Sequence, residues 1–193
     1  LHPEVSGNKF RKLKYNILEA QKHKKKTLLT FGGAYSNHIA ATAAAGKLSA
    51  LKTIGIIRGE ELGQNLEKTL AQNRTLNFAH SCGMQFSFVS RGEYRQKETL
   101  EFQQRLNEEF DKFYSVPEGG TNQLAIKGCE EILSEKDKEF NFIAASVGTG
   151  GTLSGLINAS AKNQKILGFP ALKGDFLSEE IKKYTFKNNW ELI

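Results

Sequence analysis

Residues 27–45, TLLTFGGAYSNHIAATAAA, contain a short apolar run, a glycine turn and a stretch of small residues. The run from Thr27 to Phe31 has the composition and length of a strand, and Gly32 and Gly33 end it. The residues from Ile39 onward favour a helix. This order predicts one strand followed by one helix, which is the repeating unit of a parallel α/β fold.

The same alternation recurs along the 193-residue chain. Further apolar runs of strand length are Thr53 to Ile57, Gln85 to Val89, Lys112 to Val116, Phe142 to Val147 and Lys165 to Phe169. Runs of this kind are typical of strands buried on both faces, so we expect an α/β fold with mainly parallel sheets.

Two segments between these runs have apolar residues at helical spacing. Phe102, Leu106, Phe110 and Phe113 form the first set, and residues 124–133 contain the second. We expect both faces to belong to the hydrophobic core and not to a cofactor site.

Composition predicts a cytoplasmic globular protein, because 39% of the residues are hydrophobic and no apolar run has the length of a membrane span. The spacing of Cys82 and Cys129 fits free thiols, and the four histidines are too scattered to predict a metal site. The net charge of +6 raises nucleic-acid binding as an alternative. However, the basic run Lys22 to Lys26 lies where a helix should end, and cations stabilise a helix there, so we expect no nucleic-acid partner.

The chain begins at Leu1 instead of Met and stops just after Trp190, within what looks like an incomplete strand. We therefore expect it to be a fragment, truncated at both ends.

Ligands of parallel α/β sheets bind where strands give way to helices, which directs attention to three loops: residues 31–38, 116–122 and 147–153. In the third, the glycines of Gly148 to Thr152 bring backbone N–H groups to the start of a helix, where an anion binds well. Leu153 stands where a dinucleotide fingerprint has a glycine, and no P-loop pattern is present. The loop therefore predicts a phosphate site, with a purely structural turn as the alternative.

The first loop places Ser36 and Asn37 at the start of a helix. Both residues are good helix caps, which explains them without a ligand. The same helix start also favours a bound carboxylate, so a substrate site is the second interpretation.

Lys9 follows Gly7 and Asn8 at the start of another predicted helix. The helix dipole disfavours a cation at this end, so the neutral amine is favoured there. A neutral lysine amine is what a Schiff base with an aldehyde cofactor requires. A solvated surface lysine is the alternative interpretation.

Four motifs occur in order: Gly7-Asn8-Lys9-x-Arg11-Lys12-Leu13, Ser36-Asn37-His38, Glu118-Gly-Gly-Thr-Asn122 and Gly148-Thr-Gly-Gly-Thr152. Together they resemble the 1-aminocyclopropane-1-carboxylate deaminase / D-cysteine desulfhydrase family. That family belongs to the fold-type II, tryptophan-synthase-β-like enzymes that use pyridoxal 5'-phosphate (PLP). Tyr35 and Ala40 depart from the Gln and Arg that are common in the family on either side of the second motif.

The resemblance implies a role for most of the motif residues. Lys9 would carry PLP as a Schiff base and move the substrate proton. The cofactor phosphate would be bound by Gly148, Thr149, Gly150, Gly151 and Thr152. Asn37 would hydrogen-bond the phenolic oxygen of PLP, and the substrate carboxylate would be received by Ser36, Asn37 and His38, with Ser36 also near the reacting atoms. Residues 118–122 would pass close to the ring.

The resemblance also implies two α/β domains: a smaller inserted one at residues 13–116, and a larger, incomplete one at residues 1–12 and 117–193. The implied reaction is deamination or elimination of a small amino acid to a 2-oxo acid and ammonia, in a cytoplasmic homodimer. The pyridine-nitrogen partner and an active-site tyrosine would lie beyond Ile193. The alternatives are another fold-type II PLP β-eliminase or racemase, and a non-catalytic small-molecule-binding protein on the same scaffold.

Overall fold

The computed structural model describes residue 5, residues 7–171 and residues 176–193. Residues 1–4 and 6, at the start of the predicted larger domain, lie outside the described residues. The protein has the expected α/β fold, and each strand pairing that the structure describes is parallel. The six predicted strands are confirmed, each to within two residues at its ends.

The chain divides into two compact units. The first contains residues 1–9 and 17–119, and the second contains residues 10–16 and 120–193. The predicted domain boundaries, after residues 12 and 116, stay a prediction for the whole protein.

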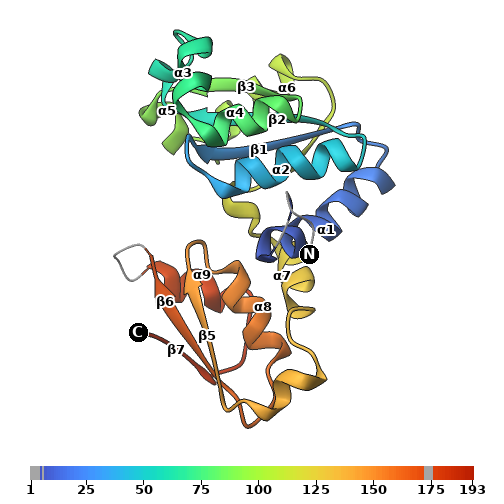
Figure 1. Ribbon diagram of the computed structural model, residues 1–193, viewed down its shortest axis with the longest axis vertical. Helices are drawn as coiled ribbons and strands as arrows, with labels where there is room; N and C mark the ends of the chain where they lie inside the picture. Colours follow the sequence, from blue (N-terminus) through green and yellow to red (C-terminus); the bar gives the residue numbers. More distant parts are fainter. Residues whose placement is uncertain (1–4, 6, 172–175) are drawn as a thin grey trace. The chain divides into compact units, whose positions relative to one another are not determined.

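The first unit is built on a four-stranded sheet with the order β3-β2-β1-β4 (Figure 1). Its strands are β1 (Thr27–Gly33), β2 (Lys52–Arg58), β3 (Met84–Val89) and β4 (Phe113–Val116). Its helices are α2 (Asn37–Leu48), α3 (Leu66–Gln72), α4 (Arg74–Ser81), α5 (Arg91–Arg95) and α6 (Leu100–Glu109), with a short 3₁₀ turn at Glu60–Leu62. A second 3₁₀ turn, Glu118–Gly120, spans the end of this unit and the first residue of the other segment.

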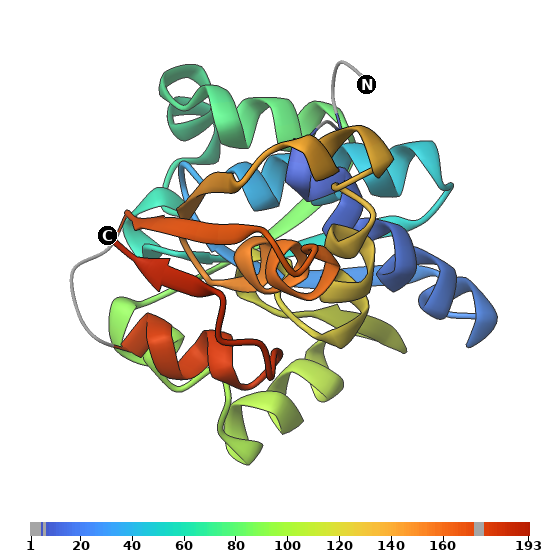
Figure 2. The same ribbon diagram turned by 90° about the horizontal axis from the view of Figure 1, so that it is seen from below.

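Two hydrophobic layers cover the faces of this sheet. Ile39 of α2 and Leu76 of α4 pack with Ile57 on one face, whereas Phe102 and Leu106 of α6 belong to the core on the other. Figure 2 shows α4, in blue-green, and α6, in yellow-green, on opposite sides of the sheet. Successive side chains of a strand point to opposite faces of the sheet, and the central residues of β1 and β2 are apolar or small on both faces. Helices must therefore pack on both faces to bury them.

The expected helical face at residues 102–113 is correct except at its end. Phe102 and Leu106 are buried in α6, and Phe110 is the residue that caps the helix. Phe113 instead lies in β4, packed against the same core. Spacing alone could not separate it from the helix, because a strand residue next to a helix can fill the same core.

The second unit contains a three-stranded sheet with the order β5-β6-β7. Its strands are β5 (Phe142–Val147), β6 (Lys165–Pro170) and β7 (Trp190–Leu192), and its helices are α7 (Gln123–Glu130), α8 (Gly151–Ala159) and α9 (Phe176–Lys182), with a 3₁₀ turn at Glu135–Glu139. Helix α1 (Gly7–Lys22) is shared, because residues 10–16 belong to this unit and its ends to the other.

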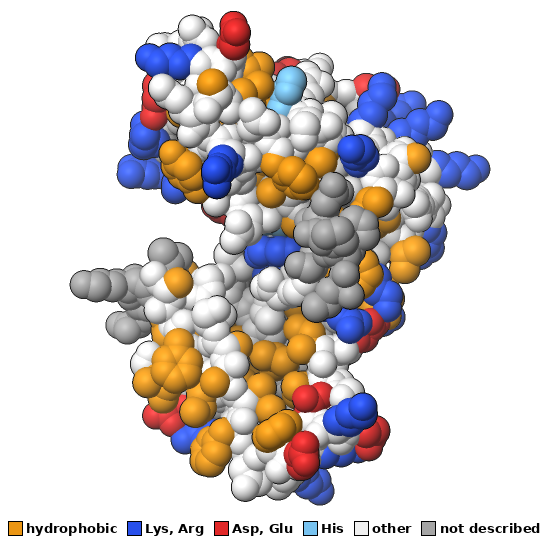
Figure 3. All heavy atoms as spheres, in the orientation of Figure 1, with side chains coloured by type: hydrophobic (Ala, Val, Ile, Leu, Met, Phe, Trp, Pro, Cys, Tyr) orange, Lys and Arg blue, Asp and Glu red, His pale blue; other side chains and the backbone are white. Residues whose placement is uncertain are grey.

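One face of the second sheet forms a core and the other is open. Ile166 packs with residues of α8 and α9 in the core. On the opposite face, Phe142 and Phe169 have 64% and 46% of their surface exposed. Hydrophobic side chains gather on the visible side of this unit (Figure 3). No helix among the described residues is long and apolar enough to cross a membrane.

Candidate active site

The predicted phosphate loop joins β5 to α8 in the second unit. Gly150 is the residue before the first turn of α8, and its φ of 79° is a left-handed conformation that glycine adopts without strain. Gly148 and Thr149 are exposed, so the loop is open to a ligand. Gly150 is the N-cap of α8 and has no side chain that could accept a hydrogen bond from the first backbone N–H groups of the helix. A ligand in the loop would therefore not compete with the cap residue for these N–H groups.

A buried lysine lies beside this loop. Lys12 of α1 is only 2% exposed, and its Nζ donates hydrogen bonds to Thr121 Oγ1 at 3.0 Å and to Thr149 Oγ1 at 3.3 Å. The two threonine hydroxyls are themselves 2.6 Å apart. These hydrogen bonds bring a cation and two hydroxyls together at the start of α8, and all three groups suit an anion with several oxygens.

The residue that faces Lys12 at the start of α8 is a glycine, Gly151. A Cβ built on Gly151 would lie 2.8 Å from Thr121 Oγ1 and 3.1 Å from Lys12 Nζ. The absence of a side chain here therefore keeps the space between the lysine and the helix start open.

An amide pair holds Lys12 to the 118–122 loop. Asn16 is fully buried, and its side chain exchanges hydrogen bonds with that of Asn122 at 2.7 and 3.2 Å. Asn16 Nδ2 also donates to the Lys12 carbonyl oxygen, while Asn122 caps α7 by accepting from Ala125 N–H. The turn of α1 that carries Lys12 is thereby fixed to the start of α7.

A second cluster anchors α1 to the end of α7. The carboxylate of Glu131 accepts hydrogen bonds from Lys14 Nζ at 2.7 Å, Tyr15 Oη at 2.5 Å and Arg11 Nη1 at 2.8 Å. The bonds from Lys14 and Tyr15 are the main reason that the pKa of Glu131 is lowered to about 2. The carboxylate is therefore ionised at neutral pH.

Substitution of Glu131 by glutamine should lower stability in a pH-dependent way. The pKa of the folded carboxyl is about 2 against an ordinary 4.5, so its stabilising effect is complete above the ordinary value and is lost as pH falls toward 2. We expect the melting temperature of Glu131→Gln to be lower than that of the wild type at pH 7, with the difference shrinking steadily below pH about 4.5. Thermal melts at pH 7, 4 and 2.5 test this.

Glu135→Gln is the control for that series, because the Glu135 side chain is 86% exposed in its pair with Lys138. It should change the melting temperature little at any pH. A difference for Glu131→Gln that stayed constant from pH 7 to 2.5 would show that packing, and not the charge, is responsible.

The predicted carboxylate loop lies in the first unit, at the start of α2. Ser36 is the N-cap of this helix, and its Oγ accepts a hydrogen bond from Ile39 N–H at 3.4 Å. The capping interpretation of Ser36 is therefore confirmed. Asn37 is the first helical residue and is exposed, so its side chain is accessible at a helix N-terminus. A role in binding substrate stays a prediction for both residues.

The side chain of His38 does not lie at the surface. It is 2% exposed, and its Nε2 is 2.8 Å from Thr30 Oγ1, which in turn donates to the Val116 carbonyl oxygen. The imidazole thus connects α2 to β1 and β4 inside the unit. Contact of His38 with a substrate carboxylate stays a prediction.

Lys9 lies in the first turn of α1, as expected from the sequence. Its side chain is partly exposed. It precedes Lys12 by three residues, a separation that places two side chains on the same face of a helix. Attachment of a cofactor to Lys9 stays a prediction.

Glu118 begins the remaining loop in the first unit, and an ion pair fixes it there. Lys97 Nζ lies 3.3 Å from its Oε2, and the same ammonium lies 5.0 Å from the centre of the Tyr94 ring. Burial, followed by the charge of Glu118, raises the pKa of Tyr94, so this tyrosine stays neutral.

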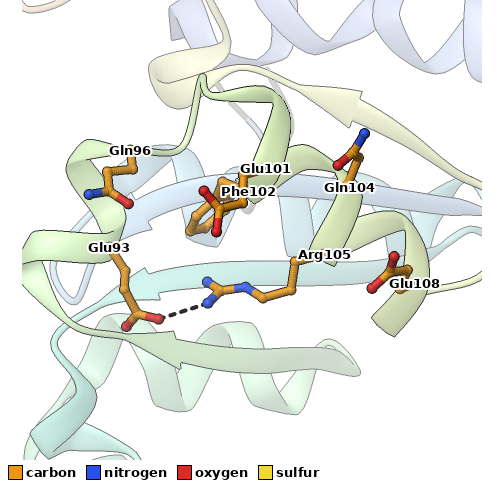
Figure 4. Close-up of a pocket in the computed structure, with 7 residues that line it drawn as sticks. All are labelled: Glu93, Gln96, Glu101, Phe102, Gln104, Arg105 and Glu108. Carbon is orange, nitrogen blue, oxygen red and sulfur yellow. Dashed lines mark hydrogen bonds and ion pairs between the residues drawn. The ribbon is translucent and has the colours of Figure 1, made fainter.

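The acidic pocket beside α5 and α6 is a weaker candidate site (Figure 4). Glu93, Glu101 and Glu108 line it. However, the Glu93 carboxylate accepts from Arg105 Nη1 at 2.8 Å and from Ser90 N–H at 3.0 Å, so it already serves as a helix-capping group. Glu101 and Glu108 project from the exposed face of α6.

Sequence reasoning missed Lys12 and Thr121 as site residues. Both lie within quoted motifs, but only the tertiary contact shows that Lys12 is buried against Thr149. The available signal was the spacing of Lys12 from Lys9, which is one helical turn.

Comparison with known proteins agrees with this geometry. Residues 1–181 match the family described as "Pyridoxal-phosphate dependent enzyme". A Thermotoga maritima protein, named as a candidate 1-aminocyclopropane-1-carboxylate deaminase, is 37% identical over 158 residues, covering 78% of this chain and 48% of its own length. A mitochondrial bifunctional D-cysteine desulfhydrase/1-aminocyclopropane-1-carboxylate deaminase of Arabidopsis thaliana is 31% identical, with 79% of this chain and 41% of its own length covered. The chain thus spans about half the length of these relatives.

Solved structures show the same fold. A structure described as an ACC deaminase homologue superimposes with a TM-score of 0.72 at 24% identity, covering 97% of this chain and 62% of that one. A serine racemase of Dictyostelium discoideum gives a TM-score of 0.64 at 20% identity, over 86% of this chain and 50% of the other. From the family match and the fold, the chain belongs to the pyridoxal-phosphate dependent enzyme family.

Proposed function

We propose that the protein binds PLP and deaminates a small amino acid, giving a 2-oxo acid and ammonia. The observation that carries the proposal is the buried ammonium of Lys12, held by Thr121 and Thr149 at the glycine-rich start of α8. A cation, two hydroxyls and the N–H groups at the start of a helix are the donors that a phosphate monoester needs.

The residues of this chain fit the cofactor. Gly148 to Thr152 and Lys12 would hold its phosphate, with Gly151 leaving the necessary space. Lys9, one turn earlier on the same face of α1, would attach its aldehyde carbon. When bound, PLP supplies an electron sink for the carbon from which the substrate loses a proton or a group.

The other residues orient the substrate and move protons. Asn37 and the first N–H groups of α2 would receive the substrate carboxylate, which the helix dipole favours by up to about 2 kcal/mol in a partly buried site. Asn37 would also donate to the phenolic oxygen of PLP. Ser36, already positioned as the N-cap, would lie near the reacting atoms. The Lys9 amine would take up the proton that leaves the substrate and return it later.

Two substrates follow from the names of the relatives. D-cysteine would give a 2-oxo acid, ammonia and hydrogen sulfide, and 1-aminocyclopropane-1-carboxylate would give 2-oxobutanoate and ammonia. Cytoplasmic location and a homodimeric state belong to the same proposal.

The test is turnover by the full-length protein that contains this chain, purified with PLP. We expect ammonia and a 2-oxo acid to form in equal amounts from at least one of the two substrates, and no product from Lys9→Ala, because that variant lacks the amine that attaches PLP and moves the proton. Formation of the opposite enantiomer of an amino acid without ammonia would instead favour a racemase. Binding without any product would favour the non-catalytic alternative.

A further inference from the structure

A cationic pocket lies at the carboxyl ends of β1 and β2 in the first unit. It has a volume of about 560 Å³ and is lined by residues that include Gly33, Tyr35, Arg58, Arg91 and Arg95. Of these, Gly33 and Arg58 are the last residues of β1 and β2. Ligands of parallel α/β sheets bind at this edge, so the pocket has the position of a substrate subsite.

The pocket has more positive than negative charge. Its lining includes three arginines but only one acidic residue, Glu61. Arg91 Nη2 lies 2.6 Å from Glu61 Oε1, and this bond lowers the pKa of Glu61, so the two charges compensate each other. Among the described residues, neither Arg58 nor Arg95 forms an ion pair with a carboxylate. Two positive charges are therefore left in excess.

Arg58 is held in a defined place. Its Cζ lies 5.6 Å from the centre of the ring of Tyr94, a residue that is only 3% exposed and lines the same pocket. The guanidinium also lies beside Gly33, where a Cβ would be 3.5 Å from Nη2. Stacking on an aromatic ring leaves the edge of a guanidinium open, and that edge matches the paired oxygens of a carboxylate, sulfonate or phosphate.

The pocket shares a wall with the predicted carboxylate site. Gly33, Ala34 and Tyr35 line it, and the next residue is Ser36, the N-cap of α2. An amino acid whose carboxylate is bound at the start of α2 would therefore have the arginines within reach of the far end of its side chain.

A second basic pocket offers a comparison. Lys24, Lys26, Lys52 and Lys112 line it together with Glu109 and Asp111, so it has a similar excess charge. However, it lies at the amino ends of the strands, where Thr27 and Lys52 begin β1 and β2. Its position does not favour a substrate, which makes it a matched control.

We propose that the pocket of Arg58 and Arg95 binds a second acidic group of the substrate. The preferred substrates are then small amino acids whose side chain ends in a carboxylate, sulfonate or phosphate. This inference rests on the proposed function, because it takes the start of α2 as the site of the substrate's own carboxylate.

Calorimetric titration of the PLP-bound full-length protein tests the inference. Aspartate and cysteate are compared with the uncharged asparagine and serine, each as both enantiomers. We expect the acidic ligands to bind at least about 10-fold more tightly than the neutral ones, and Arg58→Gln/Arg95→Gln to remove this preference, since hydrogen bonds to charged groups have about that effect. Lys26→Gln/Lys52→Gln removes the same charge from the other pocket and should keep the preference.

The outcomes separate the two proposals. Equal binding of acidic and neutral ligands, or a preference that survives in Arg58→Gln/Arg95→Gln, would overturn the subsite. Equal loss in both double variants would assign the effect to net charge and would also overturn it. Failure of the proposed function would give a different result: acidic amino acids would bind more tightly than neutral ones, but no amino acid would be converted to product.

Discussion

Replacement of Lys12 by glutamine is expected to weaken PLP binding roughly 10- to 100-fold, while binding of pyridoxal, which has no phosphate, stays nearly unchanged. The reason is the position of the Lys12 ammonium, which is 2% exposed and bonded to the neutral hydroxyls of Thr121 and Thr149. A phosphate at the start of α8 would gain a charge-assisted hydrogen bond from it.

The same substitution should also reduce the stabilisation that PLP gives. Since a ligand that binds the folded protein less tightly stabilises it less, we expect Lys12→Gln to gain less melting temperature than the wild type when PLP is added.

Absorbance titrations with PLP and pyridoxal, and melts with and without PLP, measure both effects. Lys22→Gln is the control, because Lys22 ends the same helix with a side chain that is 72% exposed. If Lys12→Gln lost affinity equally for PLP and pyridoxal, Lys12 would not be a phosphate ligand.

The second large effect is expected from Gly128→Ala. This substitution should lower the free energy of unfolding by about 3 kcal/mol or more, which is the upper end of what overpacking a protein core usually costs. A Cβ on Gly128 would lie 1.9 Å from the carbonyl oxygen of Arg11 and 2.8 Å from its carbonyl carbon. Both are backbone atoms of α1, so a side-chain rotation cannot relieve the clash, and α1 and α7 must separate.

For a chain of this length, that loss corresponds to a drop in melting temperature of about 6 °C or more. Affinity for PLP should fall as well, because the separation moves Lys12 away from Thr149. Gly92→Ala is the control: the nearest atom to its Cβ would be 3.8 Å away, so stability should be unchanged or slightly higher. One kcal/mol shifts the melting temperature of a protein of this size by about 2–4 °C. If Gly128→Ala melted within about 1 to 2 °C of the wild type, α1 and α7 would have adjusted to the added methyl group at little cost.

The strands could be predicted because each is a continuous apolar run that ends at a turn. Thr27–Gly33 and Phe142–Val147 are examples, and both lead into the loops that were predicted to bind ligands. The start of α2 was also predictable, since Ser36 has the local chemistry of a cap. Strands and helix caps depend on residues that are close together in the chain, so the sequence is enough to predict them.

What the sequence did not predict depends on contacts between distant segments. Lys12 looks like any surface lysine until α1 is packed against the loop of Thr149, 137 positions later. The bond between the His38 ring and Thr30 inside the first unit is likewise a tertiary contact that the sequence did not indicate. Burial of a single polar side chain is a tertiary property, and neither composition nor spacing determines it.

The claim that PLP is attached to Lys9 is tested most directly by reduction and peptide mapping. The full-length protein is incubated with PLP, treated with borohydride, digested and examined by mass spectrometry. We expect the mass of the reduced cofactor on Lys9, and on neither Lys12 nor the other lysines at a comparable level. Modification centred on another lysine, or no stable modification of a protein that is folded and saturated with PLP, would contradict it.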